Sequence, residues 1–324
     1  MEFLLDLNIK PLPNPICQQD PLLLMGSCFT EHIGNSLAQH KFEVMQNPHG
    51  ILFDPLSVCH ALERYIQGRL YTETDLFYLN EVWHNWHHHS RFSATQKTVA
   101  LQQMNTAVTQ AQAFLRRSKW LIITLGSSFS YQLADTGMPV ANCHRAPAQW
   151  FTKHMLEIAE TSQALKQTIQ QLQTFNPGLH IIFTISPVRH IRDGVVTNNR
   201  SKARLIESVH QLADGYAHVH YFPAYELLID ILRDYRFYDT DMVHPNYQAT
   251  AFVMEKFGAY GISEESRRLM ARLKPLLIAR QHKVQYPDTQ AYRSFMDNHL
   301  QKTLQLKKDY PFLNLDDEIA YFNS

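Results

Sequence analysis

The chain has 324 residues, which is enough to bury a sizeable core and to hold about two domains. Its 30 basic and 30 acidic residues cancel, so electrostatics gives no reason to expect a nucleic-acid or anionic-membrane partner. The 4 cysteines are scattered without a Cys-x-x-Cys pair, which favours reduced thiols and a cytoplasmic protein over disulfides or a zinc knuckle.

The first fifteen residues, MEFLLDLNIKPLPNP, lack a basic start followed by a long apolar stretch, so we expect no signal peptide. The longest apolar runs, near WLIITL and IIFTI, are far shorter than the ~20 residues that a membrane-spanning helix needs. We therefore expect no membrane association.

A serine stands where a predicted strand gives way to a predicted helix. Residues Leu22 to Met25 form the continuous apolar run of a strand buried on both faces of a parallel sheet. From Phe29 to Leu37 every fourth residue is apolar, which marks one face of a helix. Ser27 therefore lies at a helix N-terminus, where free N–H groups and the helix dipole stabilise negative charge. The alternative is that Ser27 or Thr30 merely caps the helix.

Further strands alternate with helices along the chain. Apolar runs predict strands at 42–45, 120–125, 180–186 and 218–222. Together with the first strand they predict a three-layer α/β/α sandwich around a five-stranded parallel sheet of the flavodoxin-like kind.

Two regions lie outside this alternation. Residues 54–118 contain helix patterns around a polar stretch and predict a helical insertion within a domain spanning 1–262. Residues 263–324 contain long amphipathic helices and predict a C-terminal helical extension. These helices could pack on the core or join the two subunits of a homodimer.

A carboxylate and an imidazole lie three residues apart near the end of the first domain. Asp241 and His244 fit within one short turn, so the carboxylate can contact an imidazole nitrogen. With Ser27 they predict a catalytic triad in the order Ser, Asp, His. No cofactor is needed for such chemistry.

Several blocks of sequence resemble one known family. They are GSCF at 26–29, NPHGILFDP at 47–55, SPVRHIRDG at 186–194, NNRSKA at 198–203 and DMVHP at 241–245. In this order they resemble the GSCFA family, a relative of the SGNH or GDSL-like hydrolases, over about residues 20–260. The resemblance implies an SGNH-type fold and ester hydrolysis as a class of activity.

The resemblance also implies an oxyanion hole. It places the backbone N–H groups of Ser27 and Gly50 there, although Gly50 could be an ordinary turn glycine. Ser128 stands where SGNH relatives carry an asparagine donor, and a missing donor can cost ~10²-fold or more in turnover. Asn142 is our candidate substitute.

Polar residues after the fourth strand are predicted to bind substrate. Arg189, His190, Arg200 and Lys202 follow that strand, and ligands of open α/β sheets bind at the carboxyl ends of strands. They favour a polar or anionic substrate such as an acylated sugar, whereas a solvated charged loop is the alternative. His89 is predicted to join them from the pocket rim.

The run WHNWHHHS at 83–90 is the densest group of histidines in the chain. If it were helical, His84, His87 and His88 would share a face and could bind zinc. Nearby cysteines are absent from the sequence, so we assign no metal site and place the run at the wall of the pocket.

Two alternatives remain open. Cys28 also lies at the helix N-terminus and could act as a thiolate nucleophile in place of Ser27. The chain could instead be a sugar- or anion-binding protein that keeps the fold without turnover, since one fold hosts many activities. A phosphate or nucleotide binder is disfavoured because the glycine-rich motifs are missing. The favoured function is hydrolysis of an O-acyl ester of a small-molecule or carbohydrate substrate.

Overall fold

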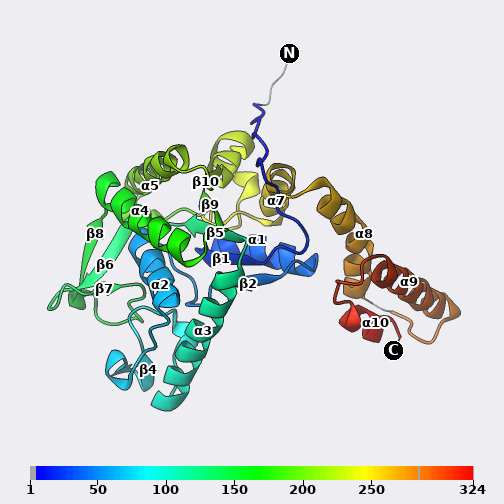
Figure 1. The fold of residues 1–324 in the computed structure, drawn as a ribbon, viewed down its shortest axis with the longest axis horizontal. Helices are drawn as coiled ribbons and strands as arrows, with labels where there is room; N and C mark the ends of the chain where they lie inside the picture. The colour runs from blue at the N-terminus through cyan, green and yellow to red at the C-terminus, as the bar shows by residue number, and fades with distance from the viewer. Residues whose placement is uncertain (1–4, 284, 324) are drawn as a thin grey trace.

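A five-stranded parallel sheet lies at the centre of the computed structural model, which describes residues 5–283 and 285–323 (Figure 1). Its strands are β1 (Leu22–Gly26), β2 (Val44–Gln46), β5 (Trp120–Leu125), β9 (His180–Ile185) and β10 (Val219–Phe222). Their order is β10-β9-β5-β1-β2, and each neighbouring pair is parallel. This order is the doubly wound order of flavodoxin-like folds. The predicted sheet is confirmed.

Helices cover both faces of the sheet. Leu22 and Leu24 point into an apolar cluster with α1 (Cys28–Gln39) and α7 (Tyr247–Gly261). Leu23 and Met25 point to the opposite side, because successive side chains of a strand alternate between faces. The helices on that side are α2 (Pro55–Gln67), α3 (Lys97–Arg117), α4 (Ile158–Phe175) and α5 (Val195–Gly215). The three-layer architecture is therefore as predicted.

The segment predicted as an insertion contributes directly to this core. The Asp54 side chain caps α2 by accepting from Ser57 N at 3.1 Å. Buried residues of α2 and α3, including Leu62 and Val108, belong to the same apolar cluster as the sheet. Between these helices lies the hairpin of β3 (Phe77–Leu79) and β4 (Val82–His84), which stands away from the sheet (Figure 1).

A second, antiparallel sheet follows β5. Its strands are β6 (Phe129–Leu133), β7 (Pro139–Val140) and β8 (Phe151–Met155), in the order β7-β6-β8. Single helical turns connect the larger elements. They are 3-10 turns at Glu73–Asp75, Ser90–Phe92, Ala148–Trp150, Ile191–Asp193 and Tyr235–Phe237, and the short α6 (Ala224–Glu226), which runs into a π-helical segment, Leu227–Leu232.

The chain ends in α8 (Glu264–Gln281), α9 (Gln290–Asp309) and α10 (Asp316–Phe322), which extend away from the sheet (Figure 1). They share an apolar cluster of their own. Glu318 of α10 is buried and forms ion pairs with Arg280 of α8 at 2.7 Å and with Lys41, just after α1, at 2.8 Å. Because breaking a buried ion pair is costly, this carboxylate fixes the extension to the α/β domain.

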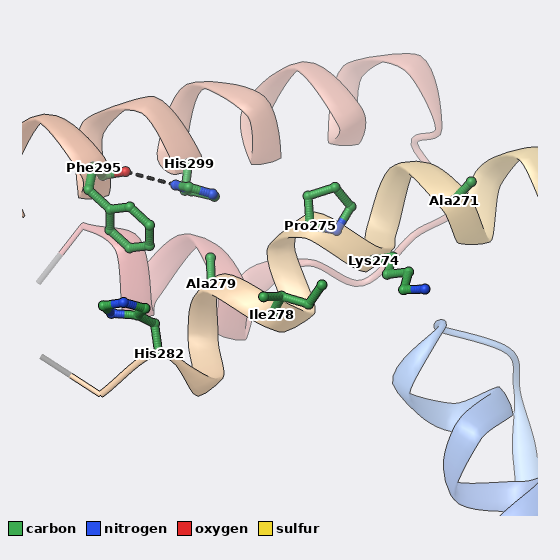
Figure 2. A pocket seen from close by; sticks show the side chains of 8 residues that line it. All are labelled: Ala271, Lys274, Pro275, Ile278, Ala279, His282, Phe295 and His299. Atoms are coloured by element: carbon green, nitrogen blue, oxygen red, sulfur yellow. Dashed lines mark hydrogen bonds between the residues drawn. The ribbon is translucent and has the colours of Figure 1, made fainter. Parts of the chain in front are cut away.

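A groove of about 350 Å³ opens between α8 and α9 (Figure 2). Its lining is mostly apolar and consists of Ala271, Lys274, Pro275, Ile278, Ala279, His282, Phe295 and His299. None of these residues belongs to the predicted triad. Within the described ranges, no helix combines the length and the apolar character required to cross a bilayer.

Candidate active site

The turn from β1 into α1 leaves room only for glycine at its first position. Gly26 has φ +132°, and a Cβ there would overlap the carbonyl of Thr124. Gly26 O accepts from Leu52 N at 3.0 Å, and Ser27 N donates to Thr124 O at 3.0 Å. The backbone beside Ser27 is therefore fixed to β5 and to the segment after β2.

The Ser27 side chain is buried and makes no cap. Ser27 occupies the N-cap position of α1, yet its hydroxyl bonds none of the helix N–H groups. Its Oγ atom has no hydrogen-bond partner within the described part of the chain. Thr30 does not cap the helix either, because its Oγ1 donates to Met25 O at 3.3 Å. The alternative of a simple helix cap therefore does not account for the Ser27 hydroxyl.

Asp241 and His244 form the pair that their spacing predicts. His244 Nδ1 lies 2.6 Å from Asp241 Oδ2, and the backbone N–H groups of His244 and Val243 donate to Asp241 Oδ1 at 3.0 and 2.8 Å. The N–H and imidazole hydrogen bonds from His244 lower the pKa of Asp241 to about 2. Both side chains are about half exposed, at 47% for Asp241 and 48% for His244. The carboxylate thus holds the imidazole in one orientation at the surface.

The imidazole of His244 lies near the start of α1 without a hydrogen bond to the Ser27 hydroxyl in the described part of the chain. Burial lowers the pKa of His32 on the second turn of α1, and the neighbouring His244 lowers it further. No hydrogen bond joins Ser27 Oγ to His244 among the described residues. The structure therefore contains the Asp–His pair and the serine as separate halves.

The two backbone donors predicted for the oxyanion hole are engaged elsewhere. Ser27 N donates to Thr124 O, and Gly50 N donates to Asn47 O at 2.7 Å. Asn142 lies in the loop after β7, where its Oδ1 accepts from His144 N at 2.8 Å. Within residues 5–283 and 285–323, no hydrogen bond joins Asn142 to the Ser27 hydroxyl. In this conformation these three residues do not form an oxyanion hole.

A buried asparagine that we did not select from the sequence, Asn47, is bonded to the residue before the serine. Asn47 Oδ1 accepts from Gly26 N at 2.9 Å, and the side chain is buried. Its Nδ2 group, a donor, has no partner in the part of the chain described. Asn47 opens the NPHG block, so its position after β2 was the available signal. Asn47 therefore combines a side-chain N–H donor that has no partner among the described residues with an amide oxygen bonded to Gly26, the residue before Ser27.

Gly50 instead makes room for His89. Gly50 has φ +83°, and a Cβ there would overlap the Cβ of His89. His89 N donates to His49 O at 2.9 Å, so the histidine run packs against the loop after β2. Burial lowers the pKa of the partly exposed His89.

Arg189 holds the Asp241–His244 turn. Its Nη1 donates to Met242 O at 3.3 Å and its guanidinium lies 4.1 Å from the centre of the Tyr238 ring. Stacking of this kind contributes about 0.5–1 kcal/mol at exposed sites. We predicted that Arg189 binds substrate, whereas its contacts in the structure position the turn.

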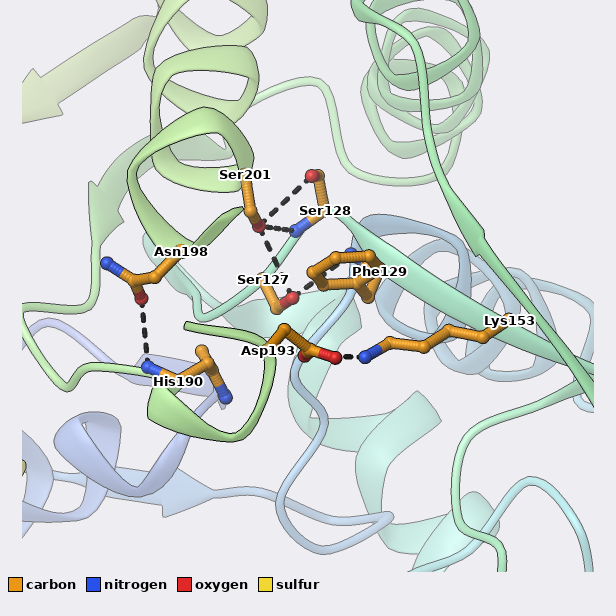
Figure 3. A network of polar contacts seen from close by, with 8 residues as sticks. All are labelled: Ser127, Ser128, Phe129, Lys153, His190, Asp193, Asn198 and Ser201. Carbon is orange, nitrogen blue, oxygen red and sulfur yellow. Dashed lines mark hydrogen bonds and ion pairs between the residues drawn. The ribbon is translucent and has the colours of Figure 1, made fainter. Parts of the chain in front are cut away.

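His190 and the following loop are tied to neighbouring elements (Figure 3). The backbone N–H of His190 donates to Asn198 Oδ1 at 2.8 Å, and Asp193 pairs with Lys153 of β8 at 2.5 Å. The ring of His190 lies edge-on to Phe53. Burial, with a contribution from the charge of Lys202, lowers the pKa of His190 to about 4.

Lys202 is buried, which corrects its predicted role in direct substrate binding. Its Nζ donates at 2.6 Å to both Gly126 O and Ser186 O, at the carboxyl ends of β5 and β9. Burial lowers its pKa to about 7. Lys202 therefore joins two strand ends beneath the site, while Arg200 on the same helix is exposed to solvent.

Ser128, which we expected at the position of the SGNH asparagine donor, belongs to a cluster of three serines (Figure 3). Ser201 Oγ accepts from Ser128 N at 2.8 Å and lies 3.0 Å from Ser128 Oγ. Ser127 Oγ lies 3.4 Å from Ser201 Oγ and accepts from Phe129 N. The Ser128 side chain thus links β5 to α5 and is buried.

The histidine run is not helical, so the shared face assumed for zinc binding is wrong. His84 ends β4, and the next residues form turns. His88 stacks on His49 with ring centres 4.1 Å apart, and His87 stacks on His60 at 4.0 Å. Over residues 5–283 and 285–323, no group of three or more His, Cys, Asp or Glu side chains could hold a metal ion.

Comparison with known proteins gives a family match and one weak structural similarity. The model of the GSCFA family matches residues 21–257, and that of the GSCFA domain protein, C-terminal domain, matches residues 273–324. No curated protein matches the chain. An acetyl xylan esterase from the rumen bacterium Butyrivibrio proteoclasticus is similar in structure, with 11% sequence identity and a TM-score of 0.37. The similarity covers 76% of this chain and 64% of the length of that one.

The family match begins just before β1 and runs through most of α7. It therefore includes the buried serine at the start of α1 and the Asp–His pair of the turn before α7. On this match, the chain belongs to the GSCFA family.

Proposed function

We propose that this protein hydrolyses an O-acyl ester of a polar, carbohydrate-type substrate. Ser27 is the nucleophile, and the His244–Asp241 pair is its base. One observation carries the proposal: a preformed Asp–His pair lies near the start of a helix whose N-cap residue, Ser27, has a buried hydroxyl with no partner among the described residues. A buried polar group left unsatisfied costs stability, and such groups call for a functional explanation.

In this mechanism His244 Nε2 accepts the proton of Ser27 Oγ while the oxygen attacks the acyl carbon. Asp241 accepts the Nδ1 hydrogen bond, which fixes the tautomer and stabilises the imidazolium. The alcohol leaves with the proton from the imidazolium, and an acyl-serine remains. Water then attacks the acyl carbon with His244 again as base, which releases the acid and restores the serine.

The negative oxygen formed during attack needs a hydrogen-bond donor. Asn47 Nδ2 is our candidate, because it lacks a partner in the described structure and its amide is fixed at Gly26. A preorganised donor of this kind typically contributes ~10²–10³-fold to turnover. The dipole of α1 also stabilises negative charge at this end of the helix.

The substrate complex must bring the serine and the imidazole together. Catalytic hydrogen bonds are often long before substrate binds and tighten in the complex. The Ser27 side chain can turn about one bond, and the turn that carries His244 is exposed.

The alternative function is binding without turnover. The missing hydrogen bond between Ser27 Oγ and His244 among the described residues, together with the engaged N–H groups of Ser27 and Gly50, favours it specifically. A protein of this kind would hold an acylated or acidic sugar and release it unchanged.

Ester hydrolysis distinguishes the two functions. We expect the wild-type protein to release nitrophenol from p-nitrophenyl acetate, or acetate from O-acetylated mono- and disaccharides. Ser27→Ala and His244→Ala should each lose this activity, while Asn142→Ala retains it. Absence of hydrolysis across the panel, or equal rates for wild type and Ser27→Ala, would leave binding as the function.

A further inference from the structure

A groove of about 560 Å³ lies between the end of β2 and α3, apart from the groove of the C-terminal helices. This volume is within the usual range for small-molecule sites. The lining residues are Met45, Gln46, Pro48, Arg91, Phe92, Gln102, Gln103, Thr106, Ala107 and Gln110.

The groove is rich in neutral hydrogen-bonding groups. Four of the lining residues are glutamines, whose amides both donate and accept, and Thr106 adds a hydroxyl. Phe92 offers an aromatic ring. Paired donors and acceptors beside an apolar ring match a sugar, which presents hydroxyls on its edge and C–H groups on its face. An acidic side chain is missing from this lining.

The face of α3 at the groove is unusual for a surface helix. Residues 98–115 contain no Asp, Glu, Lys or Arg, whereas the exposed face of a surface helix is normally charged. Gln103, Thr106 and Gln110 follow one another at spacings of three and four, so they lie on one side of the helix. All three are exposed. This side therefore offers amides and a hydroxyl over two turns.

The loop after β2 connects the groove to the serine. Asn47 accepts from Gly26 N on one side, and the next residue, Pro48, lines the groove on the other. The Arg91 guanidinium donates to Asn47 O, and it lies 3.5 Å from Glu31 on the first turn of α1. One end of the groove thus adjoins the helix turn that begins at Ser27.

We propose that this groove is the subsite for the neutral sugar portion of the substrate. The sugar lies along α3 between the glutamine amides and Phe92, and its acyl group reaches past Arg91 and Asn47 toward Ser27. The proposal rests on the proposed ester hydrolysis for the role of the bound sugar. A phosphate or carboxylate ligand fits less well, because the single cation, Arg91, is already engaged by Glu31 and by Asn47 O.

Sugar binding can be measured without turnover. We would titrate cellobiose, maltose and N,N′-diacetylchitobiose into Ser27→Ala protein by calorimetry and by saturation-transfer NMR. We expect at least one disaccharide to bind with a dissociation constant in the millimolar range or below. Adding Gln103→Ala and Gln110→Ala should weaken binding about tenfold or more, since each removes a donor and an acceptor. Gln167→Ala, at an exposed glutamine of α4 outside the groove, is the matched control.

The same variants in the active enzyme separate a binding role from a structural one. With the O-acetylated form of the bound disaccharide, the double variant should raise KM about tenfold and leave kcat unchanged. With p-nitrophenyl acetate, which is too small to fill the groove, its rates should match wild type.

The subsite is overturned if none of the three disaccharides binds to the Ser27→Ala protein, if the double variant binds as tightly as its parent, or if p-nitrophenyl acetate turnover falls equally. Failure of ester hydrolysis with sugar binding intact would overturn the proposed function alone.

Discussion

The two halves of the proposed site are built in opposite ways. The serine half is buried, and its backbone is fixed by hydrogen bonds from Ser27 N to Thr124 O and from Gly26 N to Asn47 Oδ1. The Asp241–His244 half is a solvent-exposed turn in which the Asp241 carboxylate accepts hydrogen bonds from the turn itself. The buried half therefore sets position, while the exposed half sets the orientation of a base.

Under the proposed mechanism, this contrast predicts which of the two halves moves. A Cβ on Gly26 would overlap Thr124, so the start of α1 has little freedom to shift. The turn is held from outside by Arg189 through Met242 O and Tyr238. In the proposed mechanism, closure of the turn and rotation of the Ser27 side chain are the motions that would assemble the site.

The largest effect on turnover is expected from Asp241→Asn, a change in the exposed half. The amide keeps the shape of the turn but no longer favours the Nδ1–H tautomer or stabilises the imidazolium. Turnover should fall on the order of 10²–10⁴-fold, with little change in substrate affinity. Steady-state kinetics on the best ester of the panel measures it. Unchanged kcat would mean that the pair is structural.

A smaller effect is expected on the buried half from Asn47→Asp. The carboxylate can still accept from Gly26 N, but it no longer donates to an oxyanion. We expect kcat to fall ~10²–10³-fold without unfolding, as circular dichroism would verify. Asn142→Ala is the comparison and should stay within a few-fold of wild type. The reverse result would restore Asn142 as the donor.

The smallest effect is a difference in acid sensitivity between the buried histidines and the exposed Asp241 turn. Burial, with the charge of Arg64 next, lowers the pKa of His60 to about 4, and burial likewise lowers the pKa of its stacking partner His87 to about 3. The folded-state pKa values of these two histidines lie below the ordinary value of ~6.5. At pH values between the folded and ordinary pKa, the unfolded chain therefore binds more protons than the folded chain. The stability that these histidines contribute is complete above pH ~6.5 and is lost as the pH falls toward 4, with a slope of up to about 1.4 kcal/mol per pH unit for each residue.

The turn should resist acid to a lower pH. The folded-state pKa of Asp241 is lowered to about 2, so its contribution is present above the ordinary value of ~3.9 and is lost only as the pH falls through about 2. Denaturant titrations at pH 7, 6 and 5 should show falling stability, and His60→Gln should reduce the slope. A slope that is the same in both proteins would contradict the buried, neutral state of His60.

The sequence was sufficient where local spacing decides structure. The apolar run before Gly26 predicted β1, and the three-residue interval between Asp241 and His244 predicted their hydrogen bond. Both depend on short-range geometry.

Long-range packing was not predictable in the same way. Lys202 looked like a surface charge in a polar loop, but α5 turns it inward to the carbonyls of Gly126 and Ser186. Asn47 looked like a turn residue, and its role depends on the contact between β2 and β1. The helices of residues 54–118 looked like an addition because their apolar faces give no sign of which surface they cover. Each error concerns a partner distant in sequence.

The central claim is that the Ser27 hydroxyl, which has no hydrogen-bond partner among the described residues, is the nucleophile, rather than the neighbouring Cys28 thiol. Burial raises the pKa of Cys28, and the nearby Lys202 only partly offsets this, so the thiol is poorly ionised at neutral pH.

Labelling with a fluorophosphonate, followed by peptide mass spectrometry, tests the claim most directly. We predict one adduct on Ser27, absent in Ser27→Ala and His244→Ala and retained in Cys28→Ala. Labelling and turnover that persist in Ser27→Ala and disappear in Cys28→Ala, with iodoacetamide inactivating the wild type, would contradict the account.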